Sequence, residues 1–162
     1  IMVTNSEKLA NLVSDEVERQ LSQLPRESIA RPAIENNSYI AVMDSVEDMF
    51  TVMNEVAPEH LEIQLPDPME YMSMVENAGS VFLGRYASEP LGDYVGGTNH
   101  VLPTSGTAKF SSPLGVYDFV KRISFTQFSR ERLQEVAKDI TTLARTEGLE
   151  AHARAIEVRF EK

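Results

Sequence analysis

The sequence predicts an α/β fold: an incomplete Rossmann-like domain portion with a layered parallel sheet, followed by a small helical C-terminal tail. Short apolar segments that suit strands alternate with segments whose apolar residues recur at helical spacing. This alternation is typical of parallel strands joined by right-handed helical crossovers. Beyond residue 114 helical segments predominate. We therefore predict two domains, an α/β part at 1–114 and a helical tail at 115–162.

The first elements are an apolar strand at 1–4 and an amphipathic helix. Thr4 and Glu7 have the spacing of a capping box, which predicts the start of that helix, and a Leu-Pro pair closes it. A second helical stretch follows, and Pro32 should break it. The apolar segment 39–43 then predicts the next strand.

Two further strands and two helices complete the α/β pattern. A capping pattern at 44–47 opens an apolar helical stripe that ends at Pro58. The segment 60–65 suits a strand, and Asp-Pro-Met-Glu at 67–70 combines an N-cap, a proline at the first helical position and a capping glutamate. A strand at 80–83 follows, so the order indicates parallel pairing.

The pattern changes in the second half of the chain. Residues 84–112 are rich in Gly, Ser, Thr and Pro, which predicts a long loop that is either disordered or functional and that is mobile without bound ligands. A serine cap followed by a proline predicts a short helix over 113–122. A strand at 123–128 and a helix at 130–145 follow, and Gly148 separates that helix from a last helical or extended piece.

Composition narrows the class of protein. The net charge of -10 repels a phosphate backbone, which argues against a nucleic-acid partner. No apolar run reaches the roughly 18 to 20 residues that span a bilayer, and there is no cysteine for a disulfide. We expect a cytoplasmic protein without membrane contact. The chain starts at Ile1 without a recognisable signal peptide, so we expect part of a longer protein.

Glu59 and His60 are adjacent at a junction between a predicted helix and a predicted strand. Loops at strand ends often carry function in parallel sheets. A carboxylate beside an imidazole supplies two groups that can move protons near neutral pH. The alternative is a turn with an ordinary hydrogen-bonded histidine.

The remaining histidines lie near acidic residues. Asp93 and His100 fall within the glycine-rich run at 92–106, and both residue types bind Zn²⁺ or similar cations. Their spacing equally fits a solvated loop. Glu147 and His152 converge only if the intervening glycine breaks the helix. Otherwise they are surface residues.

Five motifs, taken in order, resemble the histidinol dehydrogenase family. They are APEHLEI at 57–63, NAGSVFLG at 77–84, GDYVGGTNHVLPTSGTA at 92–108, FSSPLGVYDFVKR at 110–122 and EGLEAHARAIEVR at 147–159. No nucleotide-binding glycine motif, P-loop or serine-hydrolase elbow accompanies them. The chain therefore resembles the C-terminal part of this family, without cofactor-binding residues of its own.

The resemblance implies oxidation of L-histidinol through L-histidinal to L-histidine with two NAD⁺. It implies that His60 accepts the proton of the alcohol and that Glu59 assists the water that attacks the aldehyde. It also implies that Asp93 and His152 ligate one Zn²⁺, which orients the substrate. Glu147 would hold the substrate. The substrate contacts implied are His60, Asp93, His100, Glu147 and His152.

The family's other two zinc ligands, in a Q-x-x-H arrangement, and its NAD⁺ site lie upstream of the matched motifs. The resemblance thus implies that this chain is inactive alone. It further implies a homodimer in which the tail at 115–162 reaches the partner's site, so that Glu147 and His152 serve that partner.

Two other hypotheses remain open. One is a related dehydrogenase for another small alcohol, against which the carboxylate of Glu147 argues. The other is an assembly module without activity, whose tail docks through an apolar stripe. That stripe comprises Leu133, Val136, Ile140 and Leu143.

Overall fold

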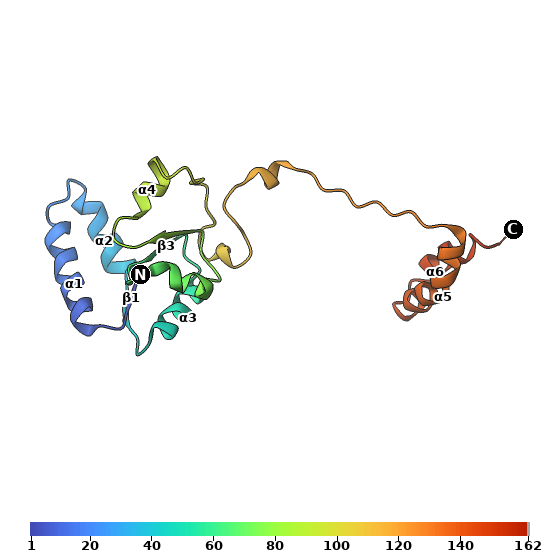
Figure 1. Cartoon of the computed structure of the whole chain (residues 1–162), viewed down its shortest axis with the longest axis horizontal. Helices are drawn as coiled ribbons and strands as arrows, with labels where there is room; N and C mark the ends of the chain where they lie inside the picture. The colour runs from blue at the N-terminus through green and yellow to red at the C-terminus, as the bar shows by residue number, and fades with distance from the viewer. Residues whose placement is uncertain (162) are drawn as a thin grey trace. The chain divides into compact units, whose positions relative to one another are not determined.

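The computed structural model describes residues 1–161, which form two compact units. The first comprises Ile1–Val120, and the second begins at Lys121. Figure 1 shows that the first unit mixes helices with short strands and that the second contains helices. The α/β class predicted for the first part of the chain is confirmed. Among the described residues, no helix is long and apolar enough to cross a membrane.

All strands of the described chain lie in the first unit. Its elements are, in order, β1 (Met2–Thr4), α1 (Glu7–Leu21), α2 (Glu27–Asn37), β2 (Ile40–Val42), α3 (Val46–Val56), β3 (His60–Ile63), the 3-10 helix η1 (Pro68–Met74), β4 (Ser80–Leu83), α4 (Glu89–Tyr94) and the 3-10 helices η2 (Thr107–Lys109) and η3 (Val116–Phe119). Strand β1 pairs with β2 and β3 with β4, both in parallel as predicted. Within the part of the chain described, they form two separate two-stranded sheets rather than one layered sheet.

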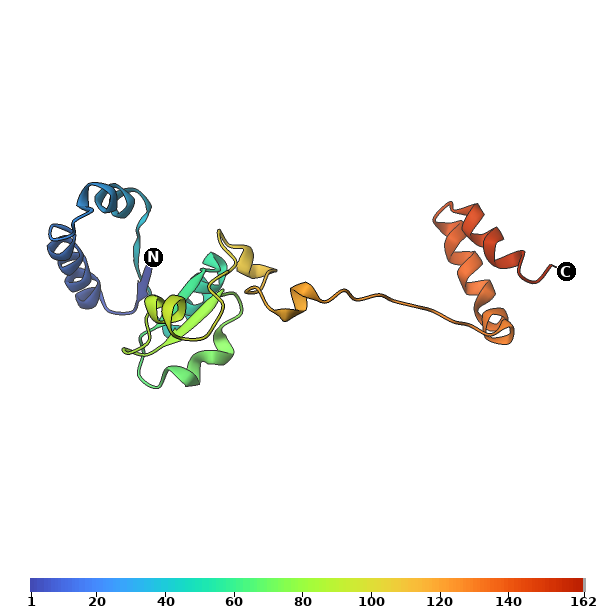
Figure 2. The same cartoon turned by 90° about the horizontal axis from the view of Figure 1, so that it is seen from above.

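Helices α1 and α2 form the crossover that joins β1 to β2 (Figures 1 and 2). The predicted cap at Thr4 is wrong, because Thr4 is buried at the end of β1. Ser6 caps α1 instead, and its hydroxyl accepts a hydrogen bond from the Leu9 backbone N–H at 3.2 Å. Pro32 lies inside α2 without breaking it. A proline removes one backbone donor, and the remaining hydrogen bonds of α2 are sufficient to continue the helix.

Two other predicted helix starts differ in detail. Ser45 rather than Asp44 caps α3, because its hydroxyl accepts from the Asp48 backbone N–H at 3.0 Å. Asp67 adopts a left-handed backbone without a side-chain cap, and a 3-10 helix follows it instead of an α-helix. The expected loop at 84–112 contains α4 and η2. Short polar segments therefore form more helix here than their composition suggests.

The core of the first unit lies between α3 and one face of the β3–β4 sheet. Phe50 and Met53 of α3 pack against Ile63 of β3, and all three are buried. The ring of Phe50 stacks on Tyr71 of η1, with centroids 5.9 Å apart. Partly buried apolar residues complete the cluster: Val46, Leu61, Leu65, Met72, Met74, Val75, Val81 and Leu83. This core fixes which face of β3 and β4 is turned inward.

The second unit is a helical pair, α5 (Arg130–Thr146) and α6 (Glu150–Glu157). Gly148 separates them with a φ of 74°, a left-handed conformation that glycine adopts at little cost. Ala144 and Ala153 are buried in this pair. The Arg145 guanidinium binds the carboxylates of both Glu150 and Glu157 on α6. The predicted helical tail is thus present.

Two predicted elements between η2 and α5 are wrong. The helix expected over 113–122 is reduced to the short η3. Within the described chain, residues 120–129 form neither helix nor strand, so the strand predicted at 123–128 is absent. A strand needs a hydrogen-bonding neighbour, and Phe125 is 93% exposed. The apolar pattern of this segment therefore does not reflect burial within the described chain.

The α3 core gives the first prediction. Phe50→Ala should lower the free energy of unfolding by about 3 to 5 kcal/mol, because it removes a ring that is 6% exposed from a packed cluster. Urea unfolding followed by tyrosine fluorescence measures this selectively, since all tyrosines lie within residues 1–120 and the chain has no tryptophan. Phe110→Ala is the control, because that ring is 82% exposed. Equal losses in the two variants would contradict the core described above.

Candidate functional site

The two faces of the β3–β4 sheet carry different residues. The strands pair in register, His60 opposite Ser80 and Glu62 opposite Phe82. Side chains alternate between faces along a strand. Leu61 and its neighbours on the same face join the α3 core. His60, Glu62 and Phe82 therefore share the opposite face.

Helix α4 lies beside that second face. Gly92 packs so closely on Phe82 that a Cβ at this position would come within 2.8 Å of the ring. Only glycine allows such an approach without a shift of the ring or the helix. The Glu89 backbone N–H donates to the Glu62 carboxylate at 3.1 Å and thereby connects the first residue of α4 to β3. The helix is thus held over the strand residues at both of its turns.

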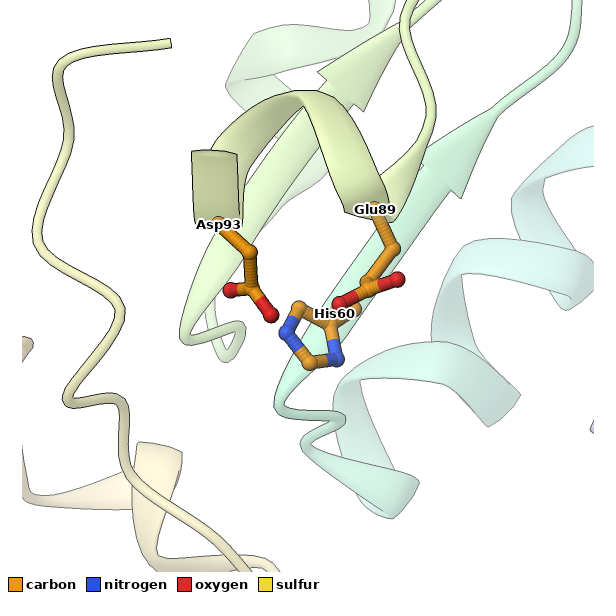
Figure 3. A group of neighbouring side chains, drawn as sticks. All are labelled: His60, Glu89 and Asp93. Atoms are coloured by element: carbon orange, nitrogen blue, oxygen red, sulfur yellow. The ribbon is translucent and has the colours of Figure 1, made fainter. Parts of the chain in front are cut away.

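His60, Glu89 and Asp93 form a group between the sheet and α4 (Figure 3). One potential ligand atom from each side chain lies within 4.8 Å of the other two. Glu89 and Asp93 are four residues apart on α4, so both carboxylates extend from one side of the helix toward the imidazole. The His60 ring also lies 6.1 Å from the Phe82 ring. His60 and Glu89 are half-buried, and Asp93 is exposed.

The electrostatics of this group are unfavourable for two free carboxylates. The neighbouring Asp93 side chain, through a shared hydrogen bond, and partial desolvation raise the pKa of Glu89, while the positive charge of His60 lowers it. A raised pKa means that the folded chain binds this proton more tightly than the unfolded chain. The associated stability is present at low pH and is lost as pH rises through the raised pKa. At neutral pH the pair therefore favours a cation or a proton donor.

The structure brings together two of the residues predicted from sequence and leaves the others apart. His60 and Asp93 meet in the group. Glu59 directly precedes β3 and is half-buried, and its carbonyl accepts from the Ser80 N–H at 2.8 Å. Its carboxylate does not belong to the group found among the described residues. His100 is exposed in the loop after α4.

Glu147 and His152 lie in the second unit. Glu147 is the C-cap residue that directly follows α5, and His152 is in the first turn of α6. Both are exposed. Gly148 breaks the helix between them. From the sequence alone, this break is the condition for Glu147 and His152 to converge. The described contacts join neither side chain to the other.

Glu89 was missed by the sequence analysis. The segment that contains it was expected to be a loop, in which no spacing rule relates Glu89 to Asp93. A signal was present in the sequence Ser-Glu-Pro at 88–90, because serine suits an N-cap and proline suits the first helical turn. A helix starting there places the two carboxylates one turn apart.

The chain resembles known proteins over almost its whole length. The family model described as histidinol dehydrogenase matches residues 1–160. Histidinol dehydrogenase of Lactiplantibacillus plantarum is 63% identical over 161 residues, covering 99% of this chain and 38% of that protein. The Streptococcus mutans histidinol dehydrogenase is 60% identical, covering 100% of this chain and 38% of that protein. The chain thus spans about 38% of the length of these curated relatives.

A solved structure agrees with the sequence relatives. The crystal structure of histidinol dehydrogenase from Elizabethkingia anophelis matches with a TM-score of 0.79 and 38% sequence identity. The match covers 98% of this chain and 36% of that chain. The likeness therefore extends through the backbone of nearly all of the chain.

The carboxylate pair gives the second prediction. Asp93→Asn should lower the pKa of Glu89 toward its ordinary value of 4.5, because it removes the carboxylate whose hydrogen bond and negative charge raise that pKa. The same variant should be more stable than the wild type at neutral pH and lose that advantage in acid. Carbon-13 NMR titration of the glutamate carboxyl groups measures the pKa, and urea unfolding at several pH values measures the stability. Asp15→Asn, on α1, is the charge-matched control. An unchanged Glu89 titration in Asp93→Asn would show that the two carboxylates do not interact.

Proposed function

The chain belongs to the histidinol dehydrogenase family, and we propose that it forms part of an enzyme that oxidises L-histidinol through L-histidinal to L-histidine with two NAD⁺. The observation that carries this proposal is the group on the α4 face. It places an imidazole next to two carboxylates within the residues that match the family, and His60 and Asp93 lie in motifs that resemble it. We propose that this activity belongs to the whole protein, in the cytoplasm, and that residues beyond the 38% of the relatives matched here complete its site.

His60 is the proposed base of both oxidations. It takes the proton of the substrate hydroxyl while the carbinol carbon loses a hydride. Glu59, adjacent in sequence, removes a proton from the water that adds to the aldehyde. His60 then takes the hydroxyl proton of the resulting hydrate. Bound NAD⁺ supplies the hydride acceptor in each step.

The carboxylate of Asp93 fits a divalent metal. Zinc is bound in proteins by carboxylate oxygen, which Asp93 offers, and by imidazole nitrogen, which His152 offers. Two neighbouring carboxylates also favour a cation, as the raised pKa of Glu89 indicates. We propose Asp93 and His152 as ligands of one Zn²⁺, which when bound orients the substrate. Glu147 then holds the substrate and His100 lines its pocket.

The other zinc ligands and the NAD⁺ site are proposed to lie in the remainder of the whole protein. A metal held by two protein ligands is short of the three or four that zinc sites in proteins provide. The 162-residue chain is therefore proposed to be inactive by itself. A related dehydrogenase acting on another small alcohol is the alternative that substrate profiling tests.

We also propose a homodimer in which the tail at 115–162 is exchanged, so that Glu147 and His152 serve the partner's site. Apolar side chains around the start of this tail support the exchange. Val116, Phe119 and Ile123 are each more than 70% exposed, and Phe125 is 93% exposed. Large exposed apolar stretches are characteristic of protein interfaces. We propose that a second copy of the chain packs against these apolar side chains.

The third prediction concerns His60. In the whole enzyme loaded with zinc, His60→Gln should lower kcat for histidinol oxidation about 10²- to 10⁴-fold, because it removes the proton acceptor. NADH absorbance during turnover measures this. Glu70→Gln is the control, since Glu70 is an exposed carboxylate of η1 outside the group.

Three outcomes would each count against a part of the proposed function. Wild-type kcat in His60→Gln would remove His60 from the chemistry. Turnover of another small alcohol in preference to histidinol would favour the related dehydrogenase. Histidinol oxidation by the 162-residue chain alone would contradict its proposed inactivity.

The fourth prediction concerns assembly. Sedimentation of the chain should show a dimer, and Phe125→Asp should shift it toward monomer by placing a charge in the proposed interface. Tyr86→Asp is the matched control, because Tyr86 is 91% exposed and lies outside the tail. A wild-type chain that stays strictly monomeric at high concentration would contradict tail exchange.

A further inference from the structure

We propose that Glu89 is a positioning residue that holds the imidazole of His60 in the tautomer and orientation needed for proton transfer. This role rests on His60 being the base of the proposed reaction. In it, one ring N–H of His60 donates to the Glu89 carboxylate, and the other ring nitrogen is left free to accept the substrate proton. The matched motifs that suggested the other site residues did not include Glu89.

The geometry supplies the partner that a catalytic imidazole needs. A histidine base is usually oriented by a third group that binds its second nitrogen. A carboxylate oxygen of Glu89 and a ring nitrogen of His60 lie within 4.8 Å of each other. Hydrogen bonds of this kind are often long without substrate and shorten in the reactive complex. Figure 3 shows the Glu89 carboxylate extending from α4 to the imidazole.

Asp93 is the other carboxylate near the ring, and it is less suited to this role. Asp93 is exposed, whereas Glu89 is half-buried beside the sheet. In the proposed function Asp93 binds the metal, and its oxygens are then engaged there. Glu89 is the carboxylate of the group that remains available to the imidazole.

Glu89 is itself held by the strand that carries His60. Its backbone N–H donates to Glu62, which lies two residues after His60 and therefore on the same face of β3. The Gln64 side-chain amide donates to the same Glu62 carboxylate at 3.1 Å. The Phe82 ring is a second neighbour of His60, tilted relative to the imidazole. The imidazole thus lies near a ring and a carboxylate whose positions depend on one strand pair.

The fifth prediction tests this role on the chain itself. Long-range proton–nitrogen NMR of histidine rings reports the tautomer of each neutral ring. The spectra are recorded about two pH units above ~6.5, the pKa of a free imidazole. His60 should show one predominant tautomer, and His60→Gln assigns its signals. In Glu89→Ala the two nitrogen shifts of His60 should move toward each other, as the tautomers mix. Glu89→Asp, which keeps the charge on a shorter side chain, should restore part of the difference.

Controls make each outcome decisive. Glu70→Ala removes an exposed carboxylate outside the group and should leave the His60 signals unchanged. If Glu89→Ala does not fold, as judged from its amide spectrum, Glu89→Gln replaces it, since the amide oxygen is a weaker acceptor in a side chain of the same shape. Unchanged His60 signals in either folded variant would overturn the proposal.

The NMR measurement needs no turnover, so it separates the positioning role from the proposed function. In the whole enzyme, Glu89→Ala should also lower kcat about 10- to 100-fold, part of the general-base contribution, with little change in KM. A tautomer shift in a protein that does not oxidise histidinol would retain the positioning role and reject the function. Histidinol turnover without a tautomer shift would retain the proposed function and reject the positioning role of Glu89.

Discussion

The parallel register between β3 and β4 is the constraint on which the site depends. Side chains alternate along a strand, so a shift of one residue would turn His60 toward α3 and Ile63 toward α4. The α3 core prevents this shift, because it buries Ile63 among apolar side chains. Burial on one face therefore determines which residues are offered for chemistry on the other.

Helix α4 completes the site because it approaches β4 so closely. The absence of a Cβ at Gly92 permits contact with Phe82, and Glu62 binds the backbone at the start of the helix. Both contacts come from strand residues on the His60 face. A six-residue helix has few hydrogen bonds of its own, so its position is determined mainly by the sheet. The carboxylates of α4 are consequently placed by the same strand pair as the imidazole.

Sequence periodicity predicted the class of fold and the parallel pairing, because both follow from local patterns of apolar residues. It placed helix caps one or two residues away from Ser6 and Ser45, since several neighbouring polar residues could serve as caps. The prediction of a strand at 123–128 was wrong, because a strand needs a hydrogen-bonding partner strand and the local sequence does not specify one. His60 and Asp93 were found through motifs. Glu89 was not, because its relation to them arises only once α4 forms and packs on β3.

The Glu89–Asp93 pair on α4 does not stabilise the folded chain at neutral pH, and it is better explained by its ability to bind a positive charge. The hydrogen bond with the Asp93 side chain, partial desolvation and the Asp93 charge all raise the pKa of Glu89, and when both carboxylates are ionised the folded chain carries a repulsion that the unfolded chain relieves. An ionised His60 opposes that rise, and a bound divalent cation would oppose it further. The arrangement is therefore most stable when positive charge enters the group.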